Sequence, residues 1–210
     1  MAQMLYQGHG SYRFTLDDGT VVYVDPFAGE GYDLPADLVL VTHEHFDHNQ
    51  VQKMPHARGC EIIRAADVHP KPGEFLTLTS HGVRITAVQA YNKNHSVDQC
   101  VGMVLEFDGV RFYASGDTST TDDMRSGKLA AMAIDYAVFP GDGKYNMNVA
   151  EASECAKLVG ARHSIPVHIA PANNPNDSSK LFSMKRAKAF SAPGRIILQP
   201  GETLDLKPNA

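Results

Sequence analysis

The chain has 210 residues, of which 43% are hydrophobic and 20% charged, and its formal net charge is −5. These proportions are ordinary for a globular protein, and the length suits a single compact domain, residues 1–210, with a substantial core. The acidic balance lacks the basic excess of a nucleic-acid-binding surface and therefore argues against one.

The cysteines and the apolar segments indicate the cellular location of the protein. Cys60, Cys100 and Cys155 lie far apart and form no C-x-x-C pair, so we expect reduced, buried thiols rather than a disulfide framework. The first residues lack a charged start followed by an apolar stretch, and no apolar run approaches the length of a membrane span. We therefore expect a soluble, cytoplasmic protein with no membrane partner.

Short β-type segments dominate the first half of the chain. Alternating and apolar runs, separated by Asp-Gly and similar turns, predict strands at residues 4–7, 12–16, 21–25, 38–42, 61–64, 75–79, 83–91, 102–107 and 110–114. A short helix is expected at residues 50–55.

The second half has a different rhythm. Helices are predicted at residues 121–132, 149–158 and 178–190, strands at 136–139 and 164–169, and a closing β pair at 195–198 and 203–206. Strands in both halves with helices between them predict two mixed sheets sandwiched between helical layers. Periodicity alone leaves their topology open.

A cluster of histidines follows the apolar strand at residues 38–42. Its sequence is His43-Glu44-His45-Phe46-Asp47-His48. Side chains alternate along an extended segment, so His43, His45 and Asp47 leave one face, while a tightening turn redirects His48. Imidazole and carboxylate are the ligands that borderline divalent metals prefer. Because the cluster adjoins a buried-type strand, a metal site explains it better than a solvated histidine-rich loop.

Three further candidates lie where other predicted strands give way to loops. His95 follows the strand at 83–91, Asp117 follows the strand at 110–114, and His168 ends the strand at 164–169. Open α/β architectures usually place their sites at such strand ends. Gly116 would let the backbone beside Asp117 approach a ligand closely.

Taken together, these motifs resemble the metallo-β-lactamase-fold hydrolase superfamily over nearly the whole chain. The resemblance is carried by residues 8–14 (GHGSYRF), 25–27 (DPF), 42–48 (THEHFDH), His95, 116–118 (GDT) and 166–168 (PVH). The chain looks most like the small single-domain branch grouped with L-ascorbate-6-phosphate lactonase, whose loop and following helix are similar to residues 140–152. This resemblance implies an α/β fold, a four-layer αββα sandwich with the site at one edge between the sheets.

The resemblance also implies two adjacent divalent ions. His43, His45 and His95 would hold the first, Asp47, His48 and His168 the second, and Asp117 would bridge them. Zinc is the default ion, and manganese or iron would tolerate the same ligands. The implied reaction is hydrolysis of a small anionic ester, lactone or phosphoester by a metal-activated hydroxide, with Asp47 and Asp117 as catalytic carboxylates. No G-x-S-x-G serine motif competes with this mechanism.

Several residues have more than one interpretation. His9 is a substrate contact, a donor to a ligand, or a histidine bonded to backbone. Asp25 either orients a ligand histidine or caps a turn. Asn146, with Lys144 and Tyr145, either reaches the pocket or belongs to a surface loop. No role is assigned to His56, His69, His81 or His163.

Other functions remain open at this point. A nuclease or RNA-processing enzyme is disfavoured by the acidic balance, and β-lactam hydrolysis by the lack of a secretory signal. A non-catalytic metal-binding module is the non-enzymatic alternative. The sequence allows a homo-oligomer, and candidate pocket walls are residues 29–35, 92–99, 141–147 and 171–178, the last as a lid or an ordinary loop.

Overall fold

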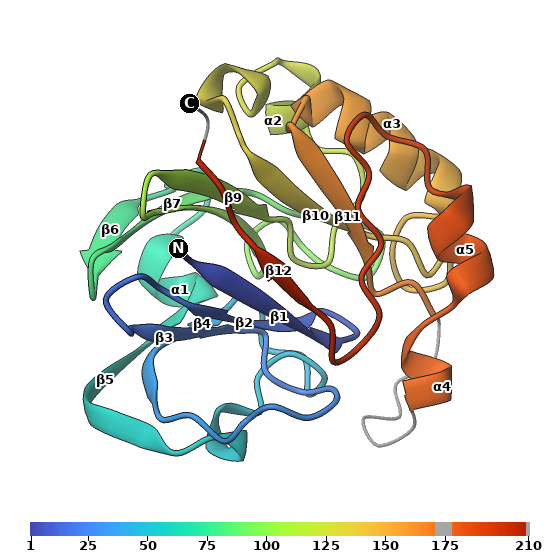
Figure 1. Ribbon diagram of the computed structural model, residues 1–210. Coiled ribbons are helices and arrows are strands. Elements are labelled where there is room, and N and C mark those ends of the chain that lie inside the picture. The colour runs from blue at the N-terminus through green and yellow to red at the C-terminus, as the bar shows by residue number, and fades with distance from the viewer. Residues whose placement is uncertain (171–177, 209–210) are drawn as a thin grey trace.

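Two six-stranded β-sheets stack on each other in the computed structural model, which describes residues 1–170 and 178–208 (Figure 1). The strands of the first sheet lie in the order β12 (Thr203–Asp205), β1 (Gln3–Gly8), β2 (Ser11–Thr15), β3 (Val21–Val24), β4 (Ala36–Val41) and β5 (His56–Arg64). Those of the second lie in the order β11 (His163–Val167), β10 (Tyr136–Pro140), β9 (Val110–Ala114), β8 (Val101–Phe107), β7 (Val83–Gln89) and β6 (Thr77–Ser80).

Both sheets are mixed, which confirms the predicted α/β class. β3, β4 and β5 run parallel in the first sheet, as do β9, β10 and β11 in the second, and the remaining pairs are antiparallel. Because parallel strands point in the same direction, their carboxyl ends gather at one edge of each sheet. The loops that leave this edge carry the predicted metal ligands.

The main core fills the space between the sheets. Alternate side chains of each strand point inward, and residues such as Phe14, Leu40 and Met103 are completely buried there. Burial of this apolar surface is the main favourable contribution to the stability of such a sandwich.

Helices cover the outer face of the second sheet. They are α2 (Asp122–Arg125), α3 (Val149–Val159) and α5 (Met184–Ala189). Asn148 caps α3 by accepting a hydrogen bond from the Glu151 N–H, and Gly160 ends the helix in a left-handed conformation. The outer face of the first sheet packs instead against loop residues such as Tyr32 and Leu34 and the 3₁₀ turn η1 (Val51–Lys53).

Some predicted elements were wrong in extent or pairing. The helix at 121–132 is broken into α2 and the 3₁₀ turn η2 (Ala130–Met132), because Gly127 between them adopts a positive φ of 79°. The helix at 178–190 is divided into α4 (Ser178–Leu181) and α5, with Ser183 capping the second. The helix at 50–55 is only η1.

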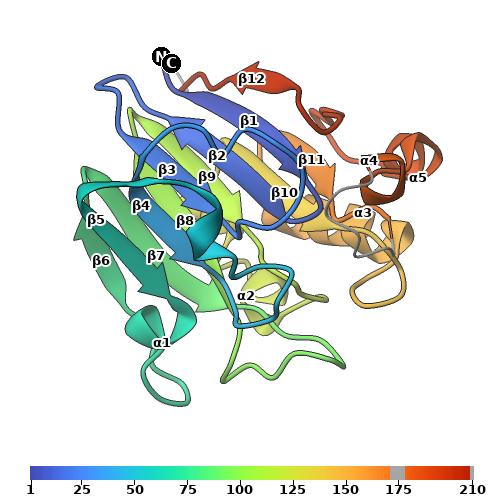
Figure 2. The ribbon, with the colours of Figure 1, turned by 90° about the horizontal axis from the view of Figure 1, so that it is seen from below.

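The predicted closing β pair does not form. β12 pairs with β1, whereas Arg195 forms an isolated bridge to Ser164 beside β11. The short helix α1 (Ala65–Val68) was not predicted, and Figure 2 shows it beside the edge where β5 and β6 lie.

Backbone hydrogen bonds join the two sheets at the edge that carries the histidine cluster. The Val101 N–H donates to the Thr42 carbonyl at 3.0 Å, and the His168 N–H donates to the His9 carbonyl at 2.8 Å. Because these bonds link segments from opposite sheets, they fix the distance across which the site residues face one another.

Candidate metal centre

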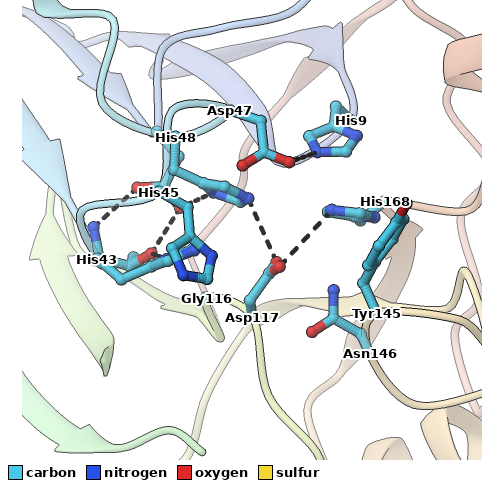
Figure 3. Close-up of polar contacts among 12 residues, drawn as sticks. His9, His43, His45, Asp47, His48, Gly116, Asp117, Tyr145, Asn146 and His168 are labelled. Carbon is cyan, nitrogen blue, oxygen red and sulfur yellow. Dashed lines mark hydrogen bonds and ion pairs between the residues drawn. The ribbon is translucent and has the colours of Figure 1, made fainter. Parts of the chain in front are cut away.

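All seven predicted ligands converge at one edge between the sheets. They come from the loops that follow β4, β7, β9 and β11, and Figure 3 shows most of them around Asp117. The structure therefore brings together side chains from residue 43 to residue 168. Their role as ligands stays a prediction.

The first group consists of His43, His45 and His95. One ring nitrogen of each lies within 4.8 Å of the others, and His95 Nε2 is 3.0 Å from His45 Nδ1. This grouping matches the set predicted for one ion. His43 and His95 are buried, whereas His45 is exposed.

The second group consists of Asp47, His48 and His168, the set predicted for the other ion, together with His9. Their ligand atoms also lie within 4.8 Å of one another. His9 Nε2 is 3.1 Å from Asp47 Oδ2, and the His9 ring lies 3.5 Å from that of His168. His9 therefore faces the site through its ring, which favours a contact with a ligand over the backbone-bonded alternative.

Asp117 lies between the two groups. Its carboxylate oxygens are 3.5 Å from His48 Nε2 and 3.6 Å from the Nε2 atoms of both His95 and His168. Burial opposes its charge, but the surrounding histidines outweigh that effect and hold the pKa of Asp117 well below its usual value. A permanently ionised, central carboxylate is suited to hold cations on both sides.

Asp25 and Thr42 fix the rings of two histidines. Asp25 Oδ2 accepts hydrogen bonds from His48 Nδ1 at 2.9 Å and from the Thr42 hydroxyl at 2.6 Å. Since Thr42 gives its only proton to Asp25, its oxygen accepts from His43 Nδ1 at 3.0 Å. Both rings thus donate from Nδ1, which leaves Nε2 of each turned toward the site. Asp25 therefore orients two predicted ligand histidines, which favours the first of its two interpretations over a turn cap.

A second polar chain fixes His95 and His168. His95 Nδ1 lies 2.8 Å from Asn92 Oδ1, and His168 Nδ1 lies 3.1 Å from Asp142 Oδ2. Asn146 connects the two, because its amide oxygen accepts from Asn92 at 2.7 Å and its amide nitrogen donates to Asp142 at 3.1 Å. Both ends of its amide are therefore occupied, which favours positioning over substrate contact.

Sequence reasoning named the loop 141–147 but gave Asp142 no role. The residue is fully buried, and burial opposes its charge, but the His168 contact outweighs this and lowers the pKa of Asp142. The signal that could have identified it is the one used elsewhere, since Asp142 follows the end of β10 directly after Gly141.

The backbone is strained where it delivers these side chains. His9, Asp25 and His168 have positive φ values of 54°, 45° and 44°. Such conformations are uncommon outside glycine and gather at functional sites. Gly10 makes room for the ring of His48, because a Cβ at Gly10 would lie 2.7 Å from His48 Cε1.

The metal-free protein should be most stable near pH 6.5. Burial lowers the pKa of His9 and of His95 to about 4, so the unfolded chain binds protons that the folded chain does not, and stability falls as the pH drops from 6.5 toward 4. Burial opposes a charge on His48, but Asp117 and Asp25 outweigh it and raise its pKa to about 9, so this stabilisation is lost as the pH rises through 9. Thermal midpoints measured in chelator across this range test the prediction, and a flat profile would contradict it.

A pocket of about 520 Å³ opens beside the first group of histidines. Its wall includes His43, His45 and His95, and continues through α1 and the loop 94–100. Part of the loop 92–99 therefore lines it, as predicted. A smaller pocket borders Asn146 and Tyr145 of the loop 141–147. Of the candidate wall at 171–178, residues 171–177 lie outside the described residues.

Comparisons with known proteins point to one family. The model of the Beta-lactamase superfamily domain matches residues 3–168. A UPF0173 metal-dependent hydrolase of Methanoregula boonei is 31% identical over 90% of this chain and 91% of its own length. One from Thermococcus onnurineus is 29% identical over 98% of this chain and its own full length.

Solved structures give the same result. A putative metal-dependent hydrolase from Parabacteroides distasonis has a TM-score of 0.71 and 28% identity, covering 92% of this chain and 90% of its own. A metallo hydrolase from Ignicoccus hospitalis has a TM-score of 0.69 at 21% identity, covering 98% of this chain and 99% of its own, and supports the fold alone.

Proposed function

This chain belongs to the family of the Beta-lactamase superfamily domain, and we propose that it is a dinuclear metal-dependent hydrolase that acts on a small anionic ester, lactone or phosphoester. Metal-dependent hydrolysis is what the names of its full-length relatives state. We propose, beyond those names, that the protein holds two ions, that they are zinc, and that the substrate belongs to this class.

One observation carries the proposal. His43, His48 and His168 are buried, and the Nε2 atom of each has no hydrogen-bond partner among the described residues. Leaving a buried polar atom unpaired costs about 1–3 kcal/mol, so three of them around one carboxylate would be a heavy loss without a ligand. Imidazole Nε2 atoms turned toward an ionised aspartate fit divalent cations, and zinc is the default for such a set.

Divalent ions bound there would polarise the substrate oxygen and lower the pKa of a water molecule to near neutrality. The chain's own residues do the rest. Asp117 would offset the repulsion between two cations, and Asp25, Asn92 and Asp142 hold the imidazole rings in the orientation that a metal needs. Asp47 bonds to His9 and can pass a proton to or from the site.

A reducing location is consistent with this proposal. Cys60, Cys100 and Cys155 are all free thiols in the structure. No helix in the described ranges is both long and apolar enough to cross a membrane. We propose a cytoplasmic enzyme whose partner is a small-molecule substrate.

Removal of metal should abolish turnover. We expect a chelator to lower the hydrolysis rate by about three orders of magnitude, the effect of losing several kcal/mol of charge stabilisation, and zinc or manganese to restore it. The measurement is metal content per chain together with rates on a lactone, a simple ester and a phosphodiester, with RNA included for the nuclease alternative. Full turnover by the metal-free protein, or two bound ions without any hydrolysis in the panel, would contradict the proposal.

A further inference from the structure

We propose that the pocket beside the metal centre binds a hydroxyl or ammonium group of the substrate, through His69 and Asp98. This proposal rests on the hydrolase proposed above and adds a recognition group to its substrate. His69 had no role in the sequence interpretation, and it lies far along the chain from every proposed ligand. It lines the same pocket as His43, His45 and His95.

The ring of His69 is held in one orientation. Its Nδ1 lies 2.7 Å from the Glu74 carbonyl, which can only accept, so Nδ1 carries the proton. Phe75 stacks on the ring at 4.3 Å with an interplanar angle of 5°. The backbone N–H of His69 donates to the Ala65 carbonyl at 2.8 Å, which ties the residue to α1.

The other ring nitrogen lacks a hydrogen bond within the described part of the chain. The side chain of His69 is only 1% exposed, and no described residue bonds to its Nε2. Asp98, which also lines the pocket, places its Oδ1 3.8 Å from this nitrogen. In the tautomer that carries its proton on Nδ1, Nε2 is an acceptor, and so is the Asp98 carboxylate. Two acceptors that face each other beyond bonding distance are satisfied by a donor placed between them.

The charges of the pocket favour the same kind of group. Arg64 is the pocket's one arginine or lysine, and its guanidinium bonds both oxygens of Glu44 at 2.8 and 2.9 Å. Asp98, half-exposed, is the remaining lining carboxylate. The wall is therefore neutral to acidic, and Ala65, Ala66 and Pro70 would contact the aliphatic part of a substrate. A second anionic group is disfavoured there, whereas hydroxyl or ammonium donors fit.

Matched small probes can test this without knowledge of the natural substrate. The probes are straight-chain carboxylates of equal length that end in a methyl, a hydroxyl or an ammonium group, titrated into the zinc-loaded protein. We expect the hydroxyl and ammonium probes to bind at least about fivefold tighter than the methyl probe, the effect of one hydrogen bond. The ¹⁵N resonance of His69 Nε2 should shift with the two donors alone. A preference for ammonium over hydroxyl would assign the recognition chiefly to the charge of Asp98.

Paired variants separate recognition from packing. His69→Asn can keep the bond to the Glu74 carbonyl but has no atom at the place of Nε2, so the preference should vanish. His69→Gln offers a polar atom near Nε2 and should keep part of it. Asp98→Asn, at a half-exposed position, should fold normally and reduce the ammonium preference.

The outcomes distinguish this proposal from the one on which it rests. Equal binding of the three probes by a protein that holds zinc and hydrolyses esters overturns the role of His69 and Asp98 alone. So does a donor preference that survives in His69→Asn. Failure to bind zinc overturns the proposed metallohydrolase. The ¹⁵N resonance of His69 Nε2, followed while the probes are added, still reports whether the pocket selects a donor.

Discussion

Replacing Asp117 with asparagine should lower kcat/KM by about 1,000-fold or more and reduce the metal content below two ions per chain. The carboxylate lies 3.5–3.6 Å from the Nε2 atoms of three histidines. An amide keeps its shape but removes the negative charge that would offset two neighbouring cations, and it has only one oxygen left to hold them. The loss should therefore exceed that of any residue that merely orients a ligand, which is typically 10- to 100-fold.

The matched control is Asp135→Asn. Asp135 is also buried, and its carboxylate accepts from the Arg111 N–H at 2.9 Å at the start of β10, where no metal ligand lies. This variant should be somewhat less stable but keep its metal and its rate. Metal content by elemental analysis and rates on the responsive substrate decide the matter. An Asp117→Asn protein that retains two ions and near-normal turnover would refute the bridging role.

The fold was predictable where local pattern and tertiary structure agree. The strands around Phe14 and Leu40 alternate or run apolar because they face the inter-sheet core, and their positions were predicted to within two residues. The helices failed where a capping or left-handed residue interrupts a helical pattern, as at Gly127 and Ser183. The partner of β12 could not be predicted, since pairing with β1 joins the two ends of the chain and leaves no local signal.

The residues of the candidate site also fall into those that the sequence predicted and those that it did not. The histidines and Asp117 were predictable because metal chemistry restricts ligand types and strand ends restrict their places. Asp142 and Asn92 were not identified, because an aspartate or asparagine in a loop usually serves the turn itself. His69 is a stronger case, since its surroundings in the sequence are ordinary. Its orphaned Nε2 follows from the Glu74 contact and from Asp98, which only the folded chain brings together.

Replacing Asp25 with asparagine should disturb two predicted ligands at once. Asp25 accepts from the Thr42 backbone N–H, the Thr42 hydroxyl and His48 Nδ1, and through Thr42 it also fixes His43. An amide nitrogen cannot accept, so at least one of these three donors loses its partner, and the hold on the two histidine rings weakens. We expect metal affinity to fall by about 10- to 100-fold. The metal-free protein should lose about 2–5 kcal/mol of unfolding free energy, the cost of one or two unpaired buried groups.

Asp37→Asn provides the comparison for Asp25→Asn. Asp37 lies on β4 of the same sheet and accepts from the Val21 N–H at 2.8 Å, but it contacts no site histidine. Zinc titration and chemical denaturation in chelator should therefore leave the metal affinity of Asp37→Asn unchanged and lower that of Asp25→Asn. If both variants lose affinity equally, the effect comes from general destabilisation of the first sheet. If Asp25→Asn binds zinc as tightly as the unaltered protein, the tautomers of His43 and His48 are set by something other than this carboxylate.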